Sequence, residues 1–267
     1  MSSYLMAGQA TELERLQLQS RVWEPAAHAL LAELPLPDSC AALDVGCGAM
    51  GWLRVLSSRV GAKGRVVGTD VDARMLDAAN ALVQAGQLAN VTIVRDDLFA
   101  SQLPPASFDL VHARFQIAPL GRAAEQIACY RRLLRAGGVL VIEDPDMASW
   151  RVNPHAPAVQ ELIDLIERGF LAAGGNFNAG RDNPALMRSV GLAPRIAARI
   201  VALEPGHPYL RLPLQFAASL RARLDALSSA EHVAALLERA EAELAREGTW
   251  GTTFTLIQTW ATASRAT

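Results

Sequence analysis

The chain has 267 residues, of which 51% are hydrophobic and 19% are charged, and its net charge is −2. This composition provides ample apolar material for a core and excludes an intrinsically disordered chain. Nucleic acids and anionic membranes attract clustered lysine and arginine, and the chain has no basic excess. We therefore expect neither nucleic acid nor a membrane as a partner, and no apolar run is long enough to span a bilayer.

Cysteine usage indicates a reducing compartment. Cys40, Cys47 and Cys129 are odd in number and lack the C-x-x-C spacing of many zinc or redox sites. The first six residues are too weakly apolar for a secretory signal. We expect a cytoplasmic protein with no disulfide framework and no bound metal.

The first segment predicts a helix that ends at Pro35 and Pro37. Thr11 and Glu14 have the spacing of a capping box at its start. An apolar stripe with helical periodicity would face the core. It consists of Leu13, Leu16, Trp23, Ala27, Leu30 and Leu31.

Strand and helix patterns then alternate as far as residue 142, which predicts a parallel sheet covered on both faces. Asp72 is expected to cap the second of the helices, and the Gly137-Gly138 pair to stop the third. The fifth strand is expected to stop before Pro145. The expected strands are 41–45, 65–69, 91–94, 108–112 and 139–142, and the expected helices are 51–60, 72–85 and 121–135.

The remainder of the chain is richer in helical patterns. Ser228 and Glu231 have capping-box spacing for the last helix. Two final strands are separated by a helical insertion, residues 204–249, which we expect to form part of a cap over the ligand crevice. The expected helices are 159–173, 182–190, 213–227 and 229–246, and the expected strands are 196–203 and 252–260.

A glycine-rich loop follows the first strand. Gly46, Gly48 and Gly51 fit G-x-G-x-x-G, which is typical of a pyrophosphate bound at a helix N-terminus. Asp44 precedes the loop, and its carboxylate about 4 Å from a pyrophosphate would cost roughly 4 kcal/mol at an effective dielectric near 20. The acid favours a phosphate-free cationic ligand such as S-adenosylmethionine, unless it only caps the turn.

Acids follow the second strand as well. Asp70 comes after the loop at about the 20-residue spacing expected for a ribose-binding acid. Asp72 is assigned to helix capping instead. Val71 and Met75 would sandwich an adenine ring, although a methionine at helical spacing also suits a core.

The third strand is followed by Asp96, Asp97 and Leu98. A carboxylate at this edge would accept from the adenine amino group, and an apolar neighbour would flank the ring, because ligands lie outside the carboxyl ends of strands. The alternative is a pair of solvated loop acids.

These motifs together resemble the class I S-adenosylmethionine-dependent methyltransferases, most closely the ubiquinone- and menaquinone-biosynthesis-like group that methylates small molecules. The resemblance covers residues 4–142 well and 176–192 more loosely. It implies an α/β fold with a Rossmann-like, doubly wound sheet of seven strands, the last antiparallel. Residues 1–37 would form a helical lid, and residues 38–203 and 250–267 would form the core. The motifs that carry it are residues 43–51, 68–76, 95–98, 107–114 and 134–142.

The resemblance also implies S-adenosyl-L-methionine as cofactor. The glycines and Arg114 would lie at its methionine part, and from the lid Tyr4, Arg15 or Gln19 would reach its carboxylate. A solvated helix face is the alternative for Arg15 and Gln19. The expected cofactor-binding residues are Tyr4, Gln19, Asp44, Gly46, Gly48, Asp70, Val71, Met75, Asp97, Leu98 and Arg114.

Methyl transfer from a sulfonium requires alignment and exclusion of water, and it needs a base only if the acceptor must lose a proton. Many relatives have a histidine where this chain has Pro119, so that base is lost. His155 and His207 are candidate bases, or turn residues. Asn178 or Arg181 would contact the acceptor, or belong to an ordinary loop.

Other side chains near the crevice are less specific. Glu143 or Asp144, at the end of the fifth strand, would orient the acceptor, whereas His112 is interpreted as structural. Phe177, Phe216 and Trp250 would form an apolar acceptor pocket or only cover the sheet.

The sequence therefore predicts methyl transfer to oxygen, nitrogen or carbon of a small organic molecule, in secondary metabolism. Two alternatives stay open: an NAD-type dehydrogenase, and an S-adenosylmethionine-pocket protein with a non-methylating role such as a pericyclase. A small-molecule acceptor is the expected partner. A homodimer is one expected assembly, and the sequence leaves the oligomeric state open.

Overall fold

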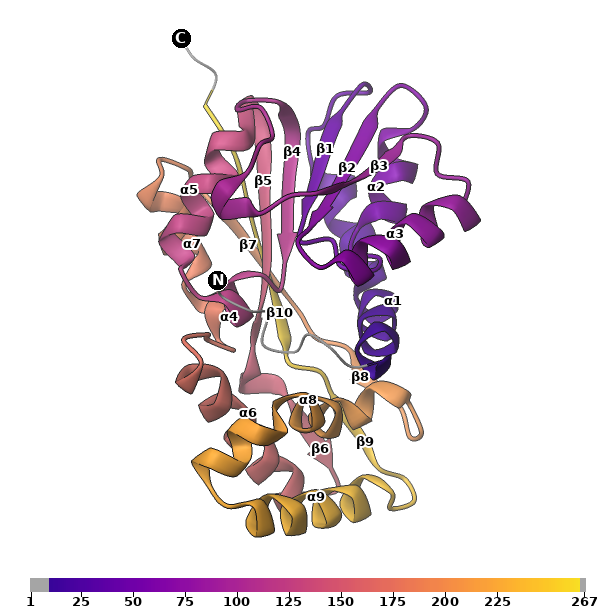
Figure 1. Cartoon of the computed structure of the whole chain (residues 1–267), viewed down its shortest axis with the longest axis vertical. Coiled ribbons are helices and arrows are strands. Elements are labelled where there is room, and N and C mark those ends of the chain that lie inside the picture. The colour runs from indigo at the N-terminus through magenta and orange to yellow at the C-terminus, as the bar shows by residue number, and fades with distance from the viewer. Residues whose placement is uncertain (1–9, 265–267) are drawn as a thin grey trace.

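The computed structural model describes residues 10–264 and contains a large and a small β-sheet. The large sheet has seven strands in the order β3-β2-β1-β4-β5-β10-β7 (Figure 1). The first five strands of the chain run parallel, and β10 is antiparallel to both its neighbours. The expected Rossmann-like sheet with an antiparallel last strand is confirmed. Its strands are β1 (Ala41–Val45), β2 (Arg65–Asp70), β3 (Val91–Arg95), β4 (Phe108–Arg114), β5 (Leu134–Asp146), β7 (Arg195–Arg199) and β10 (Thr255–Thr262).

Helices cover both faces of the large sheet, because its central strands are apolar on both sides. Successive residues of β4 alternate: Leu110 belongs to the core under one helical layer and Val111 to the core under the other. The first layer consists of α1 (Ala10–Glu33), α2 (Leu53–Val60) and α3 (Ala73–Ala85), and the second of α4 (Ile117–Leu120), α5 (Ala123–Leu133) and α7 (Asn183–Ser189).

A third apolar core lies below the large sheet in Figure 1 and belongs to a helical subdomain. Three helices pack on one another there beside the small sheet, whose order is β6-β9-β8. Trp150 and Phe216 are buried between them. The subdomain consists of α6 (Pro157–Ala172), α8 (Leu212–Leu227), α9 (Ala230–Leu244), β6 (Arg151–Asn153), β8 (Ala202–Leu203) and β9 (Trp250–Thr252).

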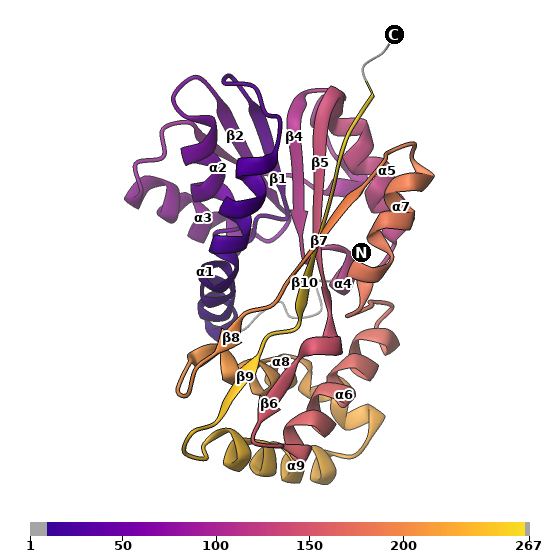
Figure 2. The same cartoon turned by 180° about the vertical axis from the view of Figure 1, so that it is seen from behind.

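The small sheet continues the last three strands of the large one. β5 leads through η2 (Met147–Ser149) into β6, β7 leads into β8, and β9 leads into β10. The order β5-β10-β7 is therefore repeated as β6-β9-β8, as the view from behind shows (Figure 2). The prediction of single strands over 196–203 and 252–260 was wrong, because each run is broken where the chain passes between the two sheets.

The prediction that the fifth strand stops before Pro145 was also wrong. β5 continues to Asp146, and Pro145 lies opposite Leu256 of β10. A proline removes one ladder donor and is tolerated where one side of a strand is unpaired. Pairing of β5 with β4 ends at Glu143, so Pro145 has a strand neighbour on the β10 side alone.

Two predicted helix boundaries also differ. The expected 121–135 helix corresponds to α5 alone, which begins at Ala123 and ends at Leu133 because β5 begins at Leu134; the short α4 before Gly121 was not predicted. The N-cap of α9 is Ser229, whose side chain accepts from the His232 N–H, rather than Ser228 paired with Glu231. Asp72 caps α3 as predicted, by accepting from the Arg74 N–H.

Further elements are short 3₁₀ turns: η1 (Leu98–Ala100), η3 (Ala179–Arg181) and η4 (Pro208–Arg211). Within residues 10–264, no helix combines the length and the apolar composition that crossing a membrane requires. The same residues hold no group of three His, Cys, Asp or Glu side chains placed to bind a metal ion.

Candidate active site

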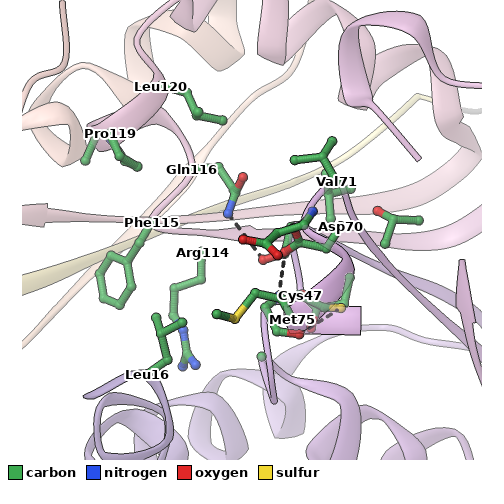
Figure 3. A pocket seen from close by; sticks show the side chains of 18 of the residues that line it. Leu16, Cys47, Asp70, Val71, Met75, Arg114, Phe115, Gln116, Pro119 and Leu120 are labelled. Carbon is green, nitrogen blue, oxygen red and sulfur yellow. Dashed lines mark hydrogen bonds between the residues drawn. The ribbon is translucent and has the colours of Figure 1, made fainter. Parts of the chain in front are cut away.

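A cavity of about 830 Å³ lies at the carboxyl ends of β1, β2 and β4 and reaches the helical subdomain (Figure 3). This is the edge of an open α/β sheet where ligands bind. Tyr4 lies outside the described residues. The remaining predicted cofactor residues all line the cavity: Gln19, Asp44, Gly46, Gly48, Asp70, Val71, Met75, Asp97, Leu98 and Arg114.

The glycine loop forms one wall of this cavity. Gly48 has φ +54°, and a Cβ there would meet only Leu16, at 3.9 Å, so the backbone is open to a ligand. Gly51 has a different reason to be glycine: a Cβ there would lie 2.2 Å from the Asp44 carboxylate. Gly51 therefore leaves space for the buried Asp44 carboxylate, and Gly48 leaves the loop backbone open to the cavity.

Asp70 ties the loop to the end of β2. Its two carboxylate oxygens accept from the backbone N–H groups of Gly48 and Asp72, each at 3.0 Å. Burial raises the pKa of this carboxyl. A carboxylate has about four lone-pair sites, so two remain for ribose hydroxyls. Val71 beside it is 51% exposed, an apolar side chain at the cavity wall (Figure 3).

Behind the loop, three side chains form a buried chain of hydrogen bonds. His112 of β4 has its Nδ1 2.7 Å from an Asp44 oxygen and its Nε2 3.1 Å from a Glu143 oxygen. The other Asp44 oxygen accepts from the Trp52 N–H at 2.7 Å, and the Trp52 ring stacks on His112 at 3.8 Å. All three members of the chain are 0–1% exposed.

Both ring nitrogens of His112 face carboxylate oxygens, and only the imidazolium can donate to both. Burial alone would lower the pKa of His112, but the charges and hydrogen bonds of Asp44 and Glu143 outweigh burial, so the pKa lies above its ordinary value. For Glu143 the signs are opposite: burial alone would raise the pKa, but the bonds to His112 and Gln258 outweigh burial, so the pKa lies below its ordinary value. We therefore assign a buried ion triad, Asp44–His112–Glu143.

This triad corrects the argument made from Asp44 in the sequence. The carboxylate lies beneath the turn, 1% exposed and paired with His112, so it does not face a ligand as an unpaired charge. The expectation that Asp44 repels a pyrophosphate is therefore wrong, because the neighbouring His112 imidazolium offsets the charge of this carboxylate. Sequence reasoning missed the pair, since the register that sets Asp44 directly opposite His112 is a property of the folded sheet.

Two buried guanidiniums stand on the opposite wall. Arg114 donates to Ser20 of α1 at 3.1 Å, and its Nε lies 4.0 Å from Glu143. Arg15 of α1 donates to Gln19 at 2.8 Å. Both arginines line the cavity, so the solvated-face alternative for Arg15 and Gln19 does not hold. Gln116, which the sequence did not single out, donates to the Gly46 carbonyl at 3.2 Å (Figure 3).

The far end of the cavity is aromatic. Phe177 packs edge-on against Phe170 at 4.8 Å and against Phe216 at 5.4 Å between ring centroids. Phe254 completes this wall, and Trp150 stacks behind Phe177 at 5.9 Å. From the sequence, Phe177 and Phe216 were singled out, but not Phe170 in the expected 159–173 helix or Phe254 in the expected 252–260 strand. Trp250 is 45% exposed on β9 and does not line the cavity.

The four candidates for catalysis or acceptor contact do not line the cavity. His155 is exposed. His207 caps η4 by accepting from the Tyr209 N–H at 3.1 Å. Asn178 accepts from the Met147 N–H at 2.9 Å and donates to Glu167, and Arg181 pairs with both oxygens of Asp146. Turn and loop roles explain all four.

Asp144 does not reach the cavity either. It is fully buried and accepts from the Ala118 N–H at 3.1 Å and from Asn183 at 3.2 Å. Burial raises its pKa to about 7. With Glu143 held in the triad, neither acid at the end of β5 is placed to orient an acceptor directly.

Comparison with known proteins agrees with this geometry. A family described as "Methyltransferase domain" matches residues 42–138. A demethylmenaquinone methyltransferase of Staphylococcus epidermidis is 28% identical over 55% of this chain. The match spans about half (56%) of the length of that protein. A trans-aconitate 2-methyltransferase of Rhizobium etli is 30% identical over 73% of this chain and 70% of its own length.

A solved structure shows the same fold. The chain superimposes on an S-adenosylmethionine-dependent methyltransferase from Aquifex aeolicus with a TM-score of 0.55 and 22% identity, over 73% of this chain and 92% of that one. The match of residues 42–138 covers the glycine loop and the acids after β2 and β3. The dehydrogenase alternative is set aside, and the chain belongs to the class I S-adenosylmethionine-dependent methyltransferases.

Proposed function

We propose that the chain transfers the methyl group of S-adenosyl-L-methionine to a small organic acceptor. One observation carries this proposal: a single cavity joins the glycine loop and strand-end acids to a pocket of buried phenylalanines. Its volume of about 830 Å³ lies toward the upper end of the roughly 300–1,000 Å³ of small-molecule sites, which leaves room for a cofactor and an acceptor together.

The described residues fit the cofactor. The open backbone at Gly48 and the two spare lone pairs of Asp70 suit the methionine part and the ribose, and the apolar wall of Val71 and Met75 suits an adenine. When bound, the sulfonium supplies an electrophilic methyl carbon. The protein's own contribution is to align the acceptor and to exclude water with its aromatic wall.

Several features stay proposals around this core. The helical subdomain, with residues 204–249, would cap the acceptor, and α1 would act as the lid. A cytoplasmic location and a homodimer stay predictions from the sequence, as do the absence of nucleic-acid partners and a role in secondary metabolism. The name of the Rhizobium etli relative specifies a small polycarboxylate as its acceptor, which supports a small-molecule acceptor here.

Replacing Asp70 with alanine is expected to weaken binding of S-adenosylhomocysteine at least tenfold, about 1.4 kcal/mol, because the ribose would lose its acceptor and the loop its anchor. Asp164→Ala, at an exposed position of α6, is the matched control and should bind as the wild type does. Isothermal titration calorimetry measures both. Absence of binding to the wild type would remove the proposed function.

A non-methylating role is the second candidate, because no described lining residue is a histidine, glutamate, lysine or tyrosine. Mass spectrometry of products formed in the presence of S-adenosylmethionine separates the two. Methyl transfer adds one methyl to the product, whereas a pericyclase retains the cofactor and gives a product of unchanged mass.

A further inference from the structure

Gln116 lies where the two halves of the cavity meet. Its side chain lines the cavity, and in the view of Figure 3 it stands between Phe115 on one side and Asp70 and Val71 on the other. Asp70 and Val71 belong to the proposed cofactor site. The ring of Phe115 packs edge-on against Phe254 of the aromatic wall, at 5.6 Å between centroids. A methyl group that passes from the cofactor to an acceptor crosses this junction.

The amide of Gln116 has a defined orientation. Its Nε2 donates to the Gly46 carbonyl at 3.2 Å. The amide lies directly on that glycine, because a Cβ at Gly46 would be 2.3 Å from the amide carbon of Gln116. An amide that donates through its nitrogen keeps its oxygen for another donor, and no donor of the described residues is paired with this Oε1. Gln116 therefore offers the cavity an uncharged hydrogen-bond acceptor.

The backbone that carries this amide is held in place. Phe115 has φ +56°, a left-handed conformation that a residue with a side chain adopts only where its surroundings impose it. Its N–H donates to the Glu143 carbonyl at 2.8 Å. The Gln116 carbonyl accepts from the fully buried Gln126 at 3.3 Å, and Gln126 in turn accepts from the Tyr130 hydroxyl at 2.7 Å. Two consecutive residues are thus directed to the two halves of the cavity.

Groups able to take a proton are missing from the aromatic end. Among the described residues, the cavity lining includes no imidazole, amine or phenol. The carboxylates of the described lining lie at the ends of β1, β2 and β3 or just after them, on the cofactor side. An acceptor that must lose a proton before it attacks finds no base at this end. The wall there is made by Phe170, Phe177, Phe216 and Phe254, each 1–4% exposed.

From these observations we propose that the acceptor is an uncharged aromatic amine whose N–H donates to Oε1 of Gln116, which makes Gln116 the specificity-determining residue; this rests on the proposed function. The amine nitrogen attacks the methyl carbon with its lone pair. The carbon–sulfur bond breaks, and its electron pair returns to sulfur, so the positive charge passes from sulfur to nitrogen. The methylated ammonium product gives up its proton to water after release.

The amide oxygen favours the transition state over the bound reactants. The nitrogen becomes positive as it attacks, and a hydrogen bond from a charged donor is about twice as strong as one from a neutral donor. Aliphatic amines are ammonium ions near neutral pH, so their lone pair is occupied and their charge is costly to bury beside phenylalanines. An aromatic amine is uncharged there, and its ring suits the aromatic wall.

The binding test uses the full chain saturated with S-adenosylhomocysteine and two probes with one apolar body, 4-propylaniline and its N,N-dimethyl derivative, which has no N–H. Calorimetry should show the aniline binding about tenfold tighter, because the derivative leaves the amide oxygen without a donor. Equal or tighter binding of the derivative, or no binding of the aniline, overturns the inference. Failure of S-adenosylhomocysteine itself to bind would instead count against the proposed function.

Variants assign the preference to Gln116. Gln116→Met has a similar length without the acceptor oxygen, and it should reduce the ratio of the two affinities to near one. Gln116→Glu keeps an acceptor oxygen and should retain the preference. Gln84→Met, at an exposed position of α3, is the control. A Gln116→Met protein that keeps the full preference, or that no longer binds S-adenosylhomocysteine, overturns the assignment of this residue to the acceptor.

The choice of an amine over a hydroxyl is tested by the reaction itself. With S-adenosylmethionine and the wild-type chain, mass spectrometry should show that 4-propylaniline gains one methyl group and that 4-propylphenol gains none, because the phenol finds no base. Methylation of the phenol, or an aniline that stays unmethylated, overturns the assignment of an amine acceptor.

Discussion

Replacing His112 with glutamine is expected to lower the free energy of unfolding by about 3–5 kcal/mol at pH 6, because the buried carboxylates of Asp44 and Glu143 would lose the cation between them. Urea denaturation of both proteins measures this difference. His28→Gln is the matched control: His28 is exposed on α1, and its replacement should change stability by less than about 0.5 kcal/mol.

The same variant tests the charge of His112 through pH. The folded-state pKa of His112 is raised above the ordinary 6.5, so its stabilisation is complete below pH 6.5 and is lost as pH rises through the folded value. The difference in unfolding free energy between wild type and His112→Gln should therefore decrease as the pH rises above 6.5. A gap that is constant from pH 6 to 8.5 would show that the imidazole is neutral in the folded protein.

Replacing Asp144 with asparagine is expected to stabilise the protein at pH 8 by up to about 4 kcal/mol. Burial raises the pKa of this carboxyl from 3.8 to about 7, so above pH 7 the wild type holds an ionised group that the fold disfavours. Asparagine keeps the shape without the charge. Asn183 donates its Nδ2 to Asp144 in the wild type, so a flip of the Asn183 side chain would turn its buried oxygen, which has no hydrogen bond among the described residues, toward the new amide.

The sign of this effect reverses the usual behaviour of acids. The folded protein holds the Asp144 proton more tightly than the unfolded chain, so wild-type stability should fall as pH rises from about 4 to 7. The neighbouring Asp146→Asn is the contrasting control. Arg181 lowers the pKa of Asp146, so its replacement should destabilise slightly, by under about 1 kcal/mol. Equal pH slopes for Asp144→Asn and wild type would contradict the prediction.

Local chemistry explains which elements the sequence could predict. The run 41–45 coincides with β1 because it is buried along its whole length and is followed by glycines. Asp72 was assigned correctly as a cap, since an acid before a helical stretch satisfies a backbone donor of its first turn. Asp70 and Asp97 were singled out because strand ends in a parallel sheet share one edge, and both line the cavity.

Features that depend on register or on distant packing could not be found in this way. The triad joins residues 68 and 31 positions apart, which meet only because β4 lies between β1 and β5. The aromatic wall is assembled from α6, α8 and two loops, so no local pattern distinguishes its phenylalanines from core. His155 lies in a turn and His207 at the N-cap of η4, both outside the cavity lining, and sequence alone does not distinguish a histidine in a turn from a histidine in a site.

The continuation of three neighbouring strands from one sheet into the other has a mechanical consequence. Side-chain bonds cross this junction, including Ser149 to the Thr253 carbonyl at 3.0 Å and Ser149 to Thr255 at 2.7 Å. A three-stranded ribbon resists bending far more than a single connecting loop does. We expect the phenylalanine side chains to stay at a fixed distance from the glycine loop. Acceptor molecules too short to reach across that distance would then be excluded by the rigid scaffold.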